Sequence, residues 1–105
     1  MSVMVARSTD QPGLEVIEGE VPGTILLAGE LDMASADILA AALRVPRPAP
    51  AARVVVDLGG LTFMDMAGLR SLQDARRELL ELGVRLVAQG ATGEPARLLR
   101  LAGGF

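Results

Sequence analysis

The chain is short and chemically restricted: it has 105 residues, half of them hydrophobic, and contains no cysteine, histidine, tryptophan, tyrosine or lysine. Without cysteine there is no disulfide, thiolate nucleophile or zinc–thiolate site. Without histidine and lysine there is no imidazole base, Schiff-base amine or P-loop lysine. We therefore expect a binding module with no catalytic residues, no cofactor and no metal, rather than an enzyme.

The charge of the chain also excludes classes of partner. The formal net charge is −3 and the ten arginines are scattered, which argues against nucleic acid because such binding needs a concentrated basic surface. No apolar run approaches the roughly 20 residues of a membrane span, and the first residues lack the pattern of a signal peptide. We expect a cytoplasmic location without direct membrane insertion.

The first third of the chain predicts strands and then a helix. Residues 1–13 are rich in turn formers and indicate either a frayed terminus or a short edge strand. Alternation over 14–18, a turn at 21–23 and the apolar run 24–29 predict a hairpin. Helix formers with an apolar stripe predict a helix over 34–43.

The rest of the chain alternates strands with helices. After a connector containing Pro46, Pro48 and Pro50, residues 53–58 are typical of a central strand. After Gly59 and Gly60, a loop over 61–64 leads to a helix ending at Gly83, followed by a strand at 84–88 and a helix starting near Pro95. The order predicts a single α/β domain over residues 1–105, with a mostly parallel mixed sheet of four to five strands and alternating helices.

Two stretches carry a more specific signal. Residues 27–32 read LAGELD, and residues 54–69 read VVVDLGGLTFMDMAGL. Together, in this order and at this spacing, they resemble the STAS domain of bacterial anti-sigma factor antagonists. The resemblance implies a STAS-like fold and a protein-interaction role, with an anti-sigma factor of kinase-type fold as partner. It implies that the partner-binding residues are Asp32, Met33, Asp65, Met66, Ala67 and Gly68.

The sequence departs from this family at one position. The residue after the loop aspartate is usually a serine or threonine that a partner kinase phosphorylates, but here it is Met66, which cannot accept phosphate. The resemblance therefore implies an antagonist that is not switched by phosphorylation at the usual site. Thr62 and Ser71 are the nearest hydroxyls.

Several local alternatives stay open. Asp65 serves either recognition or helix capping, and Gly68 serves either a partner or tight packing of helix on sheet. We expect Phe63 inside the core and Met66 outside it. A metal cluster of Glu30, Asp32 and Asp65 is disfavoured, because carboxylates at strand ends are usually solvated or paired with arginine.

A second function fits the same residues. The Asp-X-Ala-Gly-Leu form of residues 65–69 is compatible with the small STAS subunit of an ABC-type lipid transport system, which would bind the ATPase subunit. Nucleotide binding has no support in the sequence, and homo-oligomerisation is left open.

Overall fold

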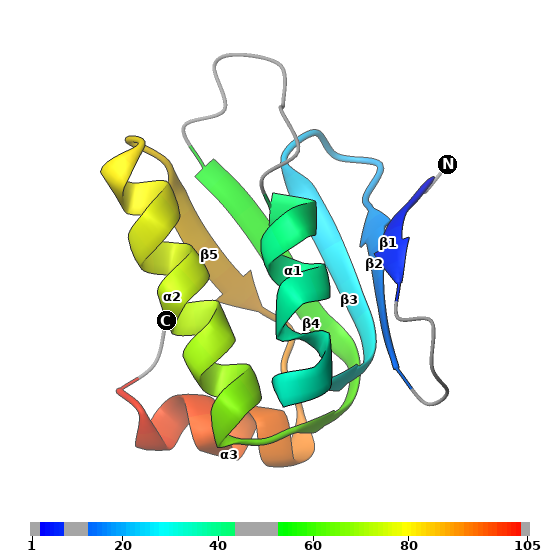
Figure 1. Ribbon diagram of the computed structural model, residues 1–105, viewed down its shortest axis with the longest axis vertical. Helices are drawn as coiled ribbons and strands as arrows, with labels where there is room; N and C mark the ends of the chain where they lie inside the picture. Colours follow the sequence, from blue (N-terminus) through cyan, green and yellow to red (C-terminus); the bar gives the residue numbers. More distant parts are fainter. Residues whose placement is uncertain (1–2, 8–12, 44–52, 104–105) are drawn as a thin grey trace.

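The computed structural model describes residues 3–7, 13–43 and 53–103, with the side chains of residues 3–6 left out (Figure 1). The predicted proline connector and the turn formers of residues 8–12 lie outside the described residues. Within them, no helix combines the length and the apolar character that crossing a membrane requires.

The strands form one five-stranded mixed sheet in the order β1-β2-β3-β4-β5. β1 pairs antiparallel with β2 and β2 with β3, whereas β3 pairs parallel with β4 and β4 with β5. The predicted α/β fold with a mixed sheet is confirmed. The sheet was expected to be mostly parallel, but two of its four pairings are antiparallel, because β1 adds a second antiparallel pair. The bounds of the strands are Val3–Arg7 for β1, Leu14–Glu18 for β2, Thr24–Leu31 for β3, Arg53–Met64 for β4 and Arg85–Gln89 for β5.

The hairpin predicted from residues 14–29 is formed by β2 and β3, and β1 pairs along its outer edge. Of the two readings of residues 1–13, the structure has the edge strand, β1. The turn between β2 and β3 closes with a hydrogen bond from the Thr24 N–H to the Val21 carbonyl oxygen, 3.1 Å. Gly23 occupies this turn at a φ of +82°, which glycine adopts without strain.

The helices lie across one face and one end of the sheet. α1 and α2 pack side by side over the face seen in Figure 1, and α3 crosses the end where β3 and β4 finish. α2 presents Leu69, Leu72 and Ala75 to the sheet, at the spacing expected for one face of a helix. The bounds are Met33–Ser35 for the short 3-10 helix η1, Ala36–Leu43 for α1, Met66–Glu81 for α2 and Gly93–Leu101 for α3.

The core between the sheet and the helices is aliphatic, as the composition predicts. Leucine dominates it, with valine, isoleucine, alanine and one methionine, and no buried aromatic side chain occurs among the described residues. The side chains with the least exposure come from β2, β3, β4, α1 and α2, and they include Leu14, Leu27, Leu31, Leu39, Leu58 and Leu72. α1 and α2 therefore pack against the sheet through one continuous apolar core.

β4 is longer than predicted. We expected the strand to end at residue 58 and a loop to occupy 61–64, but the strand continues to Met64. Leu26 pairs with Asp57 and Ala28 pairs with Gly60, so three steps along β4 face two along β3. This is a bulge, which adds one residue to a strand without ending its pairing.

A second bulge follows directly, between Leu61 and Phe63. Gly29 pairs with Leu61, whereas the next residue of β3 pairs with Phe63, so β4 again has one extra residue. The buried side chains of this segment are consequently spaced by three, at Leu58, Leu61 and Met64. The prediction that Phe63 is inside the core is wrong: its side chain is 44% exposed.

Leu58→Ala should reduce the free energy of unfolding by about 2–5 kcal/mol, because it leaves a cavity where a fully buried side chain stood. Urea unfolding measures this loss. Leu80→Ala is the matched control, since Leu80 is 64% exposed and its truncation should change stability by no more than about 0.5 kcal/mol. Equal losses in the two variants would contradict this burial pattern.

Candidate functional site

Two similar turns lie next to each other where β3 and β4 end. Because the strands are parallel and Leu31 pairs with Met64, the next residues, Asp32 and Asp65, leave the sheet at the same level. Each aspartate has an extended backbone and is the N-cap of a helix, η1 in one case and α2 in the other. The sheet thus brings together two segments that are 33 residues apart in the sequence.

The turn after β3 is held by a reciprocal capping box. The Ser35 N–H donates to Asp32 Oδ1 at 3.2 Å, and the Asp32 N–H donates to Ser35 Oγ at 2.9 Å. The Ser35 hydroxyl, 3.0 Å from the Glu30 carbonyl oxygen, also links this box back to β3. Ser35 is only 2% exposed, and the sequence analysis did not single it out. Its signal was the serine three residues after an aspartate that precedes a helix.

The turn after β4 is held by Asp65 itself. Asp65 Oδ1 accepts a hydrogen bond from the Gly68 N–H at 2.9 Å, and its carbonyl oxygen accepts one from the Leu69 N–H at 2.9 Å. The capping role left open in the sequence is therefore present. It satisfies amide groups that would otherwise lack a partner in the first turn of α2.

Gly68 allows α2 to approach the end of β3 closely. It is buried, and a Cβ atom at this position would overlap the carbonyl group of Leu31 and crowd the Met64 side chain. This is the tight packing of helix on sheet that the sequence left as one alternative. Gly68 therefore positions the turn and adds no exposed side chain to it.

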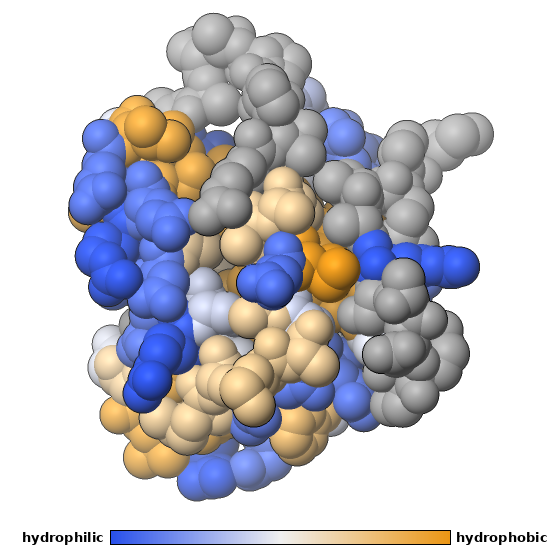
Figure 2. Space-filling model, viewed as in Figure 1, coloured by the Kyte–Doolittle hydropathy of each residue, from blue (hydrophilic) through white to orange (hydrophobic). Residues whose placement is uncertain are grey.

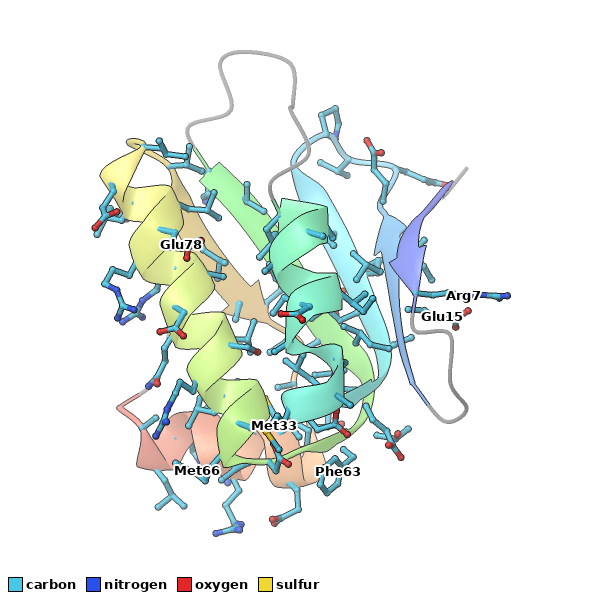
Figure 3. The ribbon with its side chains drawn as sticks, viewed as in Figure 1. Arg7, Glu15, Met33, Phe63, Met66 and Glu78 are labelled. Carbon is cyan, nitrogen blue, oxygen red and sulfur yellow. The ribbon has the colours of Figure 1, made fainter. Side chains whose placement is uncertain are left out.

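Exposed apolar side chains lie at and beside the two turns, and we call Met33, Phe63 and Met66 the apolar tip (Figure 3). Their exposed fractions are 79% for Met33, 60% for Met66 and 44% for Phe63. Figure 3 shows them at the end of the sheet where η1 and α2 begin. Figure 2 shows hydrophobic residues gathered at the same end. The expectation that Met66 lies outside the core is confirmed.

The structure brings most of the sequence-predicted site residues together. Asp32, Met33, Asp65 and Met66 occupy the two adjacent turns, and Ala67 follows Met66 with partial exposure. Gly68 shares the turn but is buried. Phe63 was assigned to the core and is the member of the tip that the sequence reasoning missed, because an apolar side chain in a segment expected to be a loop carries no signal of its direction.

The nearest hydroxyls make intramolecular hydrogen bonds. Thr62 is exposed and donates to the Gly29 carbonyl oxygen at 3.2 Å, and Ser71 donates to the Gly68 carbonyl oxygen at 2.6 Å. Among the residues that the structure describes, no cluster of three or more acidic side chains could hold a metal ion. Asp32 and Asp65 instead accept backbone N–H groups at two separate helix starts.

The clearest electrostatic pair lies on α3. Arg97 donates two hydrogen bonds to the Glu94 carboxylate, at 2.6 and 2.7 Å. These hydrogen bonds lower the pKa of Glu94 and raise the pKa of Arg97, and the attraction between the charges adds to both shifts. Both side chains are more than half exposed, so the pair contributes little to stability.

A groove of about 410 Å³ lies away from the apolar tip, between α2 and the edge strand β5. Two arginines and three aliphatic residues form its walls: Arg76, Leu80, Arg85, Leu86 and Val87. It shares no residue with the tip and is a separate surface.

Asp65→Ala should lower the free energy of unfolding by about 1 kcal/mol, because the Gly68 N–H loses its acceptor. Asp65→Asn keeps a side-chain oxygen at that position and should lose less. Urea unfolding of both variants separates the hydrogen bond from the charge. Equal losses would show that the carboxylate acts through its charge instead.

Gly68→Ala should destabilise the protein by about 1–3 kcal/mol, because the added methyl group forces α2 away from Leu31. At an unconstrained helical site the same change would stabilise by up to about 1 kcal/mol, so the two cases differ in sign. Thermal and urea unfolding report the sign. A stabilised variant would contradict the close approach of helix and strand.

The comparisons with known proteins agree with this fold. A family model described as "Mlab, STAS domain" matches residues 16–104. No curated protein matches the chain by sequence. The STAS domain of a SulP transporter from Vibrio cholerae is similar in structure, with 20% identity, 70% of this chain covered and a TM-score of 0.53. The overall structure of SLC26A9 is similar with 14% identity, 97% of this chain covered and a TM-score of 0.62.

These solved structures share the fold at low identity, and the chain spans only 60% of the first and 20% of the second. The family match covers most of the chain and includes both turns of the apolar tip. The chain belongs to the STAS domain family.

Proposed function

We propose that the chain is a protein-interaction module without enzymatic activity, and that the apolar tip is its docking surface. The observation that carries the proposal is the exposure of Met33, Phe63 and Met66 at two adjacent helix starts that are fixed by capping hydrogen bonds. Large apolar side chains exposed together at one end of a small protein are a common mark of a binding site. Thioether side chains adapt to irregular partner surfaces.

The first candidate partner is an anti-sigma factor of kinase-type fold. The support is the likeness of residues 27–32 and 54–69 to anti-sigma factor antagonists. In those proteins a phosphate after the loop aspartate would add a charge of about −1.5 to −2 to the contact surface. Met66 carries no hydroxyl, so we propose an antagonist that stays permanently in the form that its partner accepts.

The second candidate partner is the ATPase subunit of an ABC-type lipid transport system. Two observations favour it: the matching family model is described as "Mlab, STAS domain", and residues 65–69 have the Asp-X-Ala-Gly-Leu form. A transport subunit that is not regulated by a kinase needs no phosphoacceptor, which agrees with Met66. Either partner would place the chain in the cytoplasm.

Met66→Asp should weaken partner binding by about tenfold or more, because a buried, unpaired carboxylate at an interface is costly. Affinity purification from the native host, followed by calorimetric titration of the partner that is recovered, measures the loss. Leu82→Asp is the matched control: Leu82 is 78% exposed and caps the opposite end of α2, so its binding should stay within about twofold of the wild type.

The identity of the recovered partner separates the two candidates. An anti-sigma factor supports the first and an ATPase subunit the second. Equal binding by Met66→Asp and the unsubstituted protein would exclude the apolar tip as the docking surface. Stoichiometric phosphate on Thr62 or Ser71, after incubation with the partner and ATP, would contradict an antagonist that is not switched by phosphorylation.

A further inference from the structure

We propose that Met33 and Met66 are modification sites for a peroxide, and that conversion of their thioethers to sulfoxides closes the apolar tip to its partner. The switching part of this inference rests on the proposed docking function. The modification part rests on the structure of the two turns alone, and the experiment below tests it separately.

The structure divides the methionines of the described residues sharply. Met33 is 79% exposed and Met66 is 60% exposed, whereas Met64 is 2% exposed. Met33 and Met66 each directly follow an N-cap aspartate, so both sulfur-bearing side chains start at the surface of the same end of the sheet. Met64, two residues before Met66, provides an internal reference with the same chemistry but no access to solvent.

The reaction is a two-electron oxidation. A sulfur lone pair attacks one oxygen of the peroxide, an S–O bond forms and the O–O bond breaks. With hydrogen peroxide the thioether is oxidised to a sulfoxide and the peroxide is reduced to water, so atoms and electrons balance. Methionine sulfoxide reductases reverse the change, which makes it suitable as a switch.

Oxidation would change the surface without disturbing the turns that support it. The caps of η1 and α2 use the carboxylates of Asp32 and Asp65 and backbone N–H groups, and neither thioether takes part in them. A sulfoxide is polar and chiral, and it brings a strong acceptor oxygen to a side chain that was apolar. A partner that fits the reduced tip would bury that oxygen without a hydrogen bond, which disfavours binding.

Met66 occupies the position directly after the loop aspartate. In the antagonists that this chain resembles, a hydroxyl at this place changes the surface when it is phosphorylated. Here the same place holds a thioether, which cannot take a phosphate but can take an oxygen atom. The polarity of one surface would then respond to peroxide where relatives respond to a kinase.

The first part of the test uses the folded chain and hydrogen peroxide, without any partner. Peptide mass spectrometry follows the sulfoxide at each methionine with time. Met33 and Met66 should oxidise at least about tenfold faster than Met64, and unfolding in urea should make the three rates similar, because reactivity follows exposure. Similar rates in the folded protein would overturn the assignment of the modification sites.

The second part measures binding of the partner from the purification, before and after peroxide treatment. The wild type should lose about tenfold in affinity and regain it after treatment with a methionine sulfoxide reductase. The doubly substituted Met33→Leu/Met66→Leu chain is compared with itself, and its affinity should be the same before and after peroxide. Because this variant keeps Met1, Met4 and Met64, it controls for oxidation elsewhere.

The outcomes distinguish the switch from the docking function. Equal binding by reduced and oxidised wild type would overturn the switch and leave the docking function standing. Loss of binding in the double variant on peroxide treatment would also overturn it, since the effect would arise at another residue. If the untreated wild type binds no partner, the docking function and the switch both fail, while the mass spectra still decide where oxidation occurs.

Discussion

The parallel pairing of β3 with β4 is the constraint on which the apolar tip depends. It sets Leu31 beside Met64, so the two chain segments leave the sheet together and both start a helix. Gly68 then lets α2 lie directly against the carbonyl group of Leu31, where any side chain would collide. A shift of this pairing by one residue would separate the turns and turn the flanking core residues toward solvent.

The polar groups of the two turns serve the fold, and this determines what the surface offers. Asp32 and Asp65 accept backbone N–H groups, and Ser35 is buried in a reciprocal cap. The side chains left for contact are therefore mainly apolar, from Met33 and Met66. A surface of this kind gains affinity from buried apolar area, and polar changes at its centre are the ones that weaken it most.

Much of the fold could be predicted from local signals in the sequence. The β-branched run at residues 54–56, the turn at Gly23 and the helix that ends before Gly83 each follow from residues next to one another. The two bulges in β4 could not be predicted this way, because they depend on pairing with β3, whose residues lie 31 to 33 positions earlier. Phe63 was placed inside on its apolar character alone, which does not show the direction of a side chain. Ser35 had a local signal, a serine three residues after an N-cap aspartate, which the sequence reasoning did not use.

In the candidate site, some residues hold the backbone in place and others form the exposed surface. Asp65 and Gly68 hold the start of α2 through a hydrogen bond and a close approach, and a change at either position alters the fold. Met66 lies between them, yet its side chain points largely to solvent, so a different residue there would leave the cap intact. One position can thus set the chemistry of the surface while its neighbours set the geometry. The residue after Asp65 can therefore change while the hydrogen bond and the close approach that hold the turn stay in place.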